Sequence, residues 1–166
     1  VLAEWKARGG DNPAPQLMDG IMTGHRIMRK IERAGMDAKT NKGGKPIVAA
    51  LPGTGLGIGL EIPLACHRIF VADNPKAKIG LPEIMVGIFP GGGGTTRLVR
   101  KLGVMNASSF LLEGKTVDPN KAKAAGLIDE VVPADELISS AKAWIETATD
   151  ADLLKPWDAK GYKMPG

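Results

Sequence analysis

Two glutamates beside glycine-rich turns are the residues best suited to chemistry in this sequence. Glu61 falls in the first turn of a helix that we predict after the glycines of residues 53–59, and Glu83 follows Gly80-Leu81-Pro82. Two carboxyl groups that flank exposed backbone N–H donors can move protons to and from an enolisable carbonyl compound. The spacing also allows a second interpretation, in which Glu61 only caps its helix and Glu83 lies on the surface.

The glycine-rich segment Gly53-Thr54-Gly55-Leu56-Gly57-Ile58-Gly59 separates a predicted strand from a predicted helix. Unpaired N–H groups at such a helix start can bind an anion. A dinucleotide fingerprint needs glycine at relative positions one, three and six. The sixth position here is Ile58 or Leu60 in the two possible phases, and the Gly-Lys-Ser/Thr tripeptide of phosphate loops does not occur. A nucleotide-binding fold is therefore disfavoured.

The elements that must position these residues alternate between strands and helices. Residues 47–51, IVAAL, form a continuous apolar run, which is typical of a strand covered on both faces in a parallel sheet. Further strands are predicted at residues 68–72, 78–83 and 127–132. Strands that alternate with helices indicate an α/β fold built in layers.

The segment before Gly35 predicts an amphipathic helix, whose apolar face we expect to contact the core. The apolar positions at near-helical spacing are Leu17, Ile21, Met28 and Ile31. The same segment carries the excess positive charge of the chain, at Arg26, Arg29, Lys30 and Arg33. A solvated helix face explains this charge, with a small anionic ligand as the alternative. Nucleic-acid binding is not expected, because aromatic residues do not interleave with the basic ones.

Helix starts and ends are also visible further along the chain. Residues 134–148 predict a helix with one apolar face. Thr95 or Thr96 is expected to cap a helix that stops at Gly103, and Asp118-Pro119 is typical of another helix start.

The composition is that of a globular chain of about one domain. It has 166 residues, 43% of them apolar and 24% charged. The single cysteine, Cys66, excludes an internal disulfide framework and a cysteine-based zinc site; we predict a packed thiol there and no metal site. No apolar run is long enough to span a membrane, and the first residues lack a signal-peptide pattern. We therefore expect a cytoplasmic protein.

Three longer motifs carry a resemblance to a known family. They are KPIVAALPGTGLGIGLEIPLACHRIF (45–70), KIGLPEIMVGIFPGGGGTTRLVRKLG (78–103) and AKAAGLIDEVVPADEL (122–137). In this order they resemble the crotonase (enoyl-CoA hydratase/isomerase) superfamily. The stretches ACHRIFVADNPKAKIGLPE (65–83) and LKPWDAKGYKMPG (154–166) more narrowly resemble the hydratase part of multifunctional fatty-acid oxidation proteins.

The resemblance implies a crotonase-like fold of repeated ββα units and an acyl-CoA site. Glu61 and Glu83 match the two catalytic glutamates of the hydratases. Ile58, between Gly57 and Gly59, matches the middle of the usual Gly-Gly-Gly, whose backbone N–H is an oxyanion donor. Pro90 and Gly91 match a turn that helps to place substrate or water.

The implied reaction adds water to a 2-trans-enoyl-CoA and gives a 3-hydroxyacyl-CoA in fatty-acid β-oxidation. The alternatives are another crotonase-fold reaction (enoyl-CoA isomerase, hydrolase or decarboxylase), or an inactive, truncated interaction domain. A β-branched residue such as Ile58 disfavours φ > 0, so we expect a distorted oxyanion donor if that position needs left-handed backbone.

The resemblance also implies that the chain is truncated at the N-terminus. VLAEWKA (1–7) resembles the helix just after the Ala-Gly-Ala-Asp-like loop that supplies the other oxyanion N–H. We expect a partial acyl-CoA-binding domain over 1–148, with low activity alone, and a linker or the start of a missing C-terminal part over 149–166. No cofactor is expected, because NAD would serve only an absent dehydrogenase part. The expected assembly is a trimer-like homo-oligomer or a β-oxidation complex.

Overall fold

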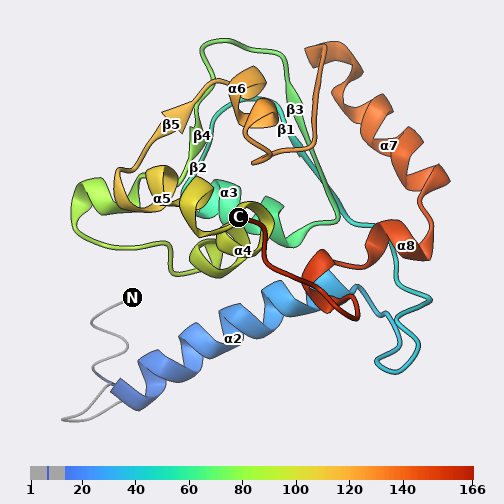
Figure 1. The fold of residues 1–166 in the computed structure, drawn as a ribbon, viewed down its shortest axis with the longest axis horizontal. Coiled ribbons are helices and arrows are strands. Elements are labelled where there is room, and N and C mark those ends of the chain that lie inside the picture. Colours follow the sequence, from blue (N-terminus) through green and yellow to red (C-terminus); the bar gives the residue numbers. More distant parts are fainter. Residues whose placement is uncertain (1–6, 8–13) are drawn as a thin grey trace.

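The structure is a computed structural model that describes Ala7 and residues 14–166. The interpretation of residues 1–7 therefore lies outside the described residues, apart from Ala7. Within them, strands form two three-stranded sheets, and helices cover both faces of the first sheet (Figure 1). The predicted alternation of strands and helices is confirmed.

The first sheet contains β1 (Val48–Leu51), β3 (Arg68–Ala72) and β6 (Glu130–Val132), with β3 in the centre and both pairings parallel. Side chains on β3 alternate between two clusters, as the twofold repeat of a strand requires. Ile69 and Val71 join the main core, whereas Phe70 and Ala72 pack against α7 (Leu137–Thr147). β1 is an edge strand within the described residues, and its side chains also alternate between the two clusters. Ala49 and Leu51 pack on the main core, whereas Val48 and Ala50 pack on the α7 side, so the predicted coverage on both faces is confirmed.

The second sheet is small but sets up the site. It joins β2 (Gly55–Leu56) to β4 (Ile79–Gly80) in parallel, and β4 to β5 (Thr116–Val117) in antiparallel orientation. The strand predicted over 78–83 is shorter because Pro82 cannot donate a ladder hydrogen bond. A 3₁₀ helix, η1 (Pro82–Val86), begins there instead.

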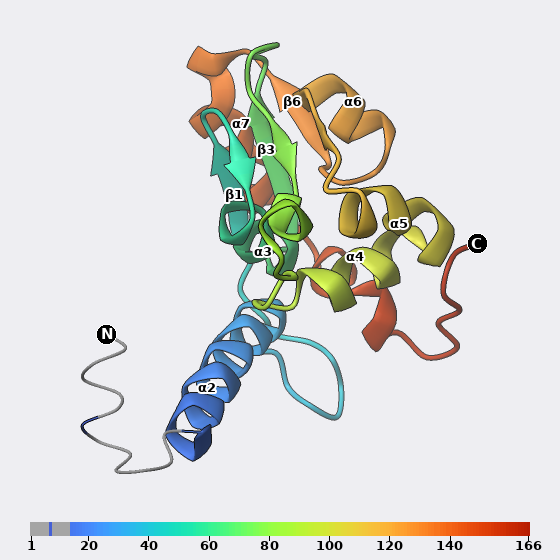
Figure 2. The ribbon, with the colours of Figure 1, turned by 90° about the vertical axis from the view of Figure 1, so that its left-hand side faces the viewer.

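Helix α2 (Ala14–Arg33) confirms the first predicted helix, but only its C-terminal part packs on the body (Figure 2). Met28 is buried, whereas Leu17 and Ile21 are 49% and 45% exposed. The prediction of a fully core-facing stripe is therefore wrong for the first turns. Periodicity shows that a helix has an apolar face, but it does not show how much of that face finds a partner.

Short helices cover the other side of the sheet. They are α3 (Ile58–Ala65), α4 (Gly94–Leu102), α5 (Val104–Leu112) and α6 (Pro119–Ala124). Asp118 caps α6 as predicted, since its side chain accepts the Lys121 N–H at 2.9 Å. Helix α4 stops at Gly103, also as predicted, where φ is +82°.

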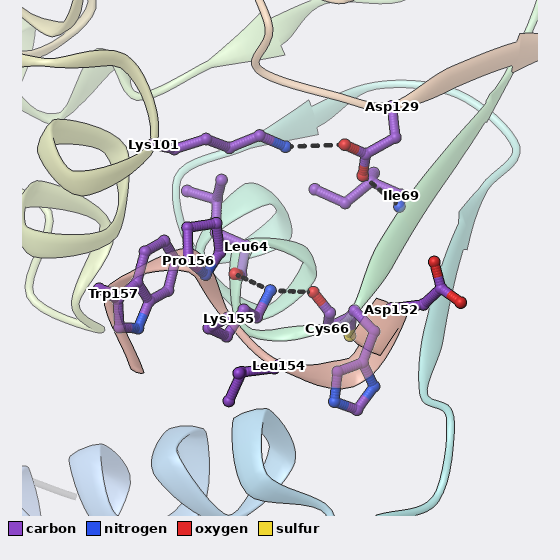
Figure 3. Close-up of a pocket in the computed structure, with 11 residues that line it drawn as sticks. Leu64, Cys66, Ile69, Lys101, Asp129, Asp152, Leu154, Lys155, Pro156 and Trp157 are labelled. Carbon is purple, nitrogen blue, oxygen red and sulfur yellow. Dashed lines mark hydrogen bonds and ion pairs between the residues drawn. The ribbon is translucent and has the colours of Figure 1, made fainter. Parts of the chain in front are cut away.

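The last residues fold back onto the body. Helix α8 (Asp150–Leu153) and the 3₁₀ helix η3 (Pro156–Asp158) follow α7. Lys155 donates hydrogen bonds to the carbonyl oxygens of Leu64, at 3.2 Å, and Cys66, at the C-terminal end of α3 (Figure 3). These residues line a cavity of about 220 Å³, and burial lowers the pKa of Lys155 to about 8. The domain boundary at 148/149 stays a prediction.

Candidate active site

The two glutamates come together because β2 and β4 are neighbours. Each strand is followed at once by the element that carries a glutamate: β2 leads into α3 with Glu61, and β4 leads into η1 with Glu83. The pairing continues past the strands, since the Gly57 N–H donates to the Gly80 carbonyl at 3.2 Å. Parallel strands deliver their following loops to the same edge, so residues 22 positions apart in the sequence meet there.

Glu61 is almost fully buried, with 3% of its surface exposed. Its Oε1 accepts a hydrogen bond from the Gly94 N–H, the first residue of α4, at 2.7 Å. A Cβ at Gly92 would lie 2.9 Å from Oε2, and one at Gly94 would lie 2.9 Å from Oε1. Glycine is therefore required at both positions for the carboxylate to fit. The interpretation of Glu61 as only a cap of its own helix is wrong, because its carboxylate bonds the start of another helix.

The helix cap predicted at Thr95 or Thr96 is also wrong. Gly93 is the N-cap of α4 and no side chain caps the helix from that position. The hydroxyl of Thr95 instead donates to the Pro90 carbonyl at 3.3 Å. The carboxylate of Glu61, 33 residues upstream, takes the place of a local cap. Capping rules consider only neighbouring residues, so the local sequence could not predict this contact.

Glu83 lies against a different glycine turn, the one that precedes α3. Its Oε1 lies 3.3 Å from the position that a Cβ of Gly57 would occupy, and its Oε2 is buried without a hydrogen-bond partner. Burial raises the pKa of Glu83 above its ordinary value, and the negative charge of Glu61 raises it further. The negative charge of each carboxyl group therefore affects the other. Glu83 as a whole is half-buried, so it lies at the edge of the surface with one carboxylate oxygen turned inward.

Ile58 occupies the first position of α3 with ordinary helical backbone, since it is not among the residues with positive φ. The left-handed backbone that glycine permits falls one residue earlier, at Gly57, where φ is +56°. The conflict expected from a β-branched residue therefore does not arise. Among the described residues the Ile58 N–H has no hydrogen-bond partner, and neither does the Gly59 N–H.

The turn that precedes α4 differs in detail from the prediction. Pro90 is buried and Gly91 is exposed, and a Cβ at Gly91 would only touch the Phe89 carbonyl oxygen at 4.0 Å. The glycines that touch the Glu61 carboxylate are Gly92 and Gly94. Sequence reasoning missed both, although four consecutive glycines were the signal that a close approach was needed there.

Cys66 and His67 have structural surroundings. The Cys66 thiol is buried, which raises its pKa, and donates weakly to the Ile62 carbonyl at 3.6 Å. The imidazole of His67 bridges the Ile47 N–H and the Glu32 carbonyl, and burial lowers its pKa. These contacts confirm the prediction of a packed thiol. Among residues 14–166 and Ala7, no cluster of three metal-ligating side chains occurs, and no helix is long and apolar enough to cross a membrane.

Comparison with known proteins shows which family the chain resembles. The family model described as enoyl-CoA hydratase/isomerase matches residues 29–154. The chain is 47% identical over 96 residues to the fatty acid oxidation complex subunit alpha of Shewanella amazonensis, which covers 58% of the chain. It is 45% identical over 113 residues to the glyoxysomal fatty acid beta-oxidation multifunctional protein MFP-a of Cucumis sativus, which covers 68% of the chain. The matched parts are 14% and 15% of those relatives.

Solved structures show the same fold. An enoyl-CoA hydratase from Bacillus anthracis matches 85% of the chain and 50% of its own length, with 33% identity and a TM-score of 0.66. An enoyl-CoA hydratase structure from Geobacillus kaustophilus matches 80% of the chain and 47% of its own length, with 30% identity and a TM-score of 0.69. The predicted crotonase-like α/β fold is confirmed. The chain belongs to the enoyl-CoA hydratase/isomerase family.

Proposed function

We propose that the protein carrying this chain is an enoyl-CoA hydratase that adds water to a 2-trans-enoyl-CoA and forms a 3-hydroxyacyl-CoA. One observation supports this most directly. The carboxyl groups of Glu61 and Glu83 flank the start of α3, where the Ile58 N–H is free to donate. An acid, a base and an oxyanion donor around one point are the groups that water addition to a conjugated thioester requires.

In the proposed reaction the Glu61 carboxylate takes a proton from water as the hydroxyl adds to C3. The electron pair of the C2–C3 double bond moves into the thioester, and the Ile58 N–H stabilises the enolate oxygen. Glu83 then donates its proton to C2. The raised pKa of Glu83 favours its protonated form, which supports its assignment as the acid. Gly57 and Gly59 keep the turn open for the thioester, and Pro90 and Gly91 help to place substrate or water.

The names of the relatives support a place in fatty-acid β-oxidation. Because the chain spans only about a seventh of the curated relatives, the activity of the whole protein is proposed by similarity.

We infer that the hydratase part needs no cofactor, that NAD would serve a dehydrogenase part, and that the protein is cytoplasmic. A trimer-like homo-oligomer or a β-oxidation complex is the proposed assembly. We also propose that residues 1–148 belong to one acyl-CoA-binding domain.

The proposal is tested by replacing Glu83 with glutamine in the intact protein that carries this sequence. Hydration of crotonyl-CoA, followed by the loss of enoyl absorbance, should slow by about 10²–10⁴-fold, the usual contribution of a general acid or base. The matched control is Glu146→Gln on α7, where the glutamate is exposed and the rate should not change.

Product analysis separates hydration from the alternative reactions. Formation of a 3-hydroxyacyl-CoA from a 2-enoyl substrate supports the hydratase. If only 3-enoyl substrates react and give 2-enoyl products, the protein is an isomerase; release of free CoA or carbon dioxide identifies a hydrolase or a decarboxylase. An unchanged rate in the Glu83→Gln variant would remove Glu83 from the mechanism.

A further inference from the structure

A buried ion pair lies next to the turn of residues 92–94, which precedes α4 and contacts the Glu61 carboxylate. Arg97 on α4 donates from Nε to Oε1 of Glu32 on α2, at 2.8 Å. Both side chains are buried, with 8% and 3% of their surfaces exposed. The two residues are 65 positions apart, so this ion pair connects two elements that are distant in the sequence.

Arg97 also holds the turn itself. Its Nη1 donates to the Gly92 carbonyl at 3.2 Å, and a side chain at Gly93 would collide with the guanidinium. On the other side of the same turn, Gly92 and Gly94 touch the Glu61 carboxylate, and the Gly94 N–H donates to it. The turn is therefore packed between the Arg97 guanidinium and the Glu61 carboxylate.

The second carboxylate oxygen of Glu32 also accepts a hydrogen bond from an arginine. Arg29 donates to Oε2 of Glu32 at 2.9 Å and to both carboxylate oxygens of Asp158 at 2.8 Å. Both oxygens of Glu32 thus have a charged donor, and the pair cannot rotate without breaking these bonds. A guanidinium suits this role because it can bond a carboxylate and a carbonyl at once in fixed directions.

We propose that Arg97 and Glu32 are positioning residues for the proposed hydration. They fix the turn of residues 92–94 and through it the direction of the Glu61 carboxylate. Neither side chain forms a hydrogen bond with Glu83 or with the Ile58 N–H, so their effect passes through the turn. This inference rests on the proposed function for its kinetic consequence, but its structural consequence can be measured separately.

The test is Arg97→Lys in the intact protein. Lysine keeps the charge and can pair with Glu32, but a single ammonium group cannot reproduce the fork that also bonds the Gly92 carbonyl. We expect kcat to fall by about 10- to 100-fold, as misplacement of a catalytic group does, while KM changes by less than about threefold. Hydrogen–deuterium exchange of the peptide spanning residues 91–98 should become about tenfold faster, since the turn opens locally.

The matched control is Arg68→Lys, because Arg68 forms an ion pair with Glu130 at 2.6 Å and does not contact the turn. Its kcat and the exchange of residues 91–98 should equal those of the wild type. If Arg97→Lys does not fold, Glu32→Gln provides the same test, since it keeps the shape and removes the charge.

Two results separate this inference from the proposed function. If exchange at residues 91–98 is as slow in the folded Arg97→Lys or Glu32→Gln variant as in the control, the positioning role is overturned. If exchange rises only in these variants while the wild type does not hydrate crotonyl-CoA, the positioning of the turn is supported and the proposed reaction is the part that fails.

Discussion

At the scale of single residues, the Ile58 N–H can be removed without changing the helix. Proline is tolerated at the first position of a helix, which has no intrahelical use for its N–H, and Ile58 occupies that position in α3. We expect Ile58→Pro to lower kcat by about 10²–10³-fold, the cost of one oxyanion donor. Ile58→Ala keeps the donor and should lose far less activity. Equal losses in the two variants would show that the side chain, not the N–H, matters.

The coupling between the two glutamates gives a prediction about pH. Burial and the charge of Glu61 both raise the pKa of Glu83. Glu61→Gln removes the negative neighbour and thereby favours the ionised form of Glu83, so the pKa of Glu83 should fall toward its ordinary value. A ¹³C NMR titration of the glutamate carboxyl groups in both proteins measures this shift. A pKa that stays the same or rises would show that the two groups do not interact.

At the scale of elements, α3 is held at its C-terminal end by Lys155, a residue about 90 positions later in the sequence. Lys155 donates to two carbonyl oxygens at the C-terminal end of α3. Lys155→Met leaves both acceptors without that donor, which should lower the free energy of unfolding by about 1–3 kcal/mol. Urea unfolding measures the change. Lys160→Met is the control because Lys160 is exposed. An equal effect at both positions would contradict the idea that Lys155 stabilises the C-terminal end of α3 through its hydrogen bonds.

At the scale of the whole molecule, residues 149–166 join parts of the fold that are far apart. Asp158 holds Arg29 on α2, and the Tyr162 hydroxyl donates to the Arg100 carbonyl at 2.6 Å. A chain that ends at Ala148 should therefore unfold at a lower temperature than the full chain, measured by circular dichroism. A chain that ends at Tyr162 keeps these contacts and should match the full chain. Equal unfolding temperatures for all three would instead support the predicted linker from residue 149.

Local pattern in the chain was enough to identify the residue types of the site. Helix α2, the strand at residues 68–72 and the Asp118 cap follow from periodicity and from side chains that bond their own backbone neighbours. The residues alone suggested proton transfer by Glu61 and Glu83, but the catalytic roles proposed for them rest on resemblance to a family, since carboxylates beside glycines also occur as caps and surface groups.

Contacts between distant segments decided the rest. The pairing of β2 with β4 brings Glu61 and Glu83 to the same edge of that sheet, and the Glu61 carboxylate replaces the local cap expected for α4. The exposure of Leu17 depends on which surfaces lie opposite α2. Each of these outcomes depends on a contact between groups that are tens of residues apart in the sequence. Periodicity and capping rules describe interactions within a few residues, so they contain no information about such distances.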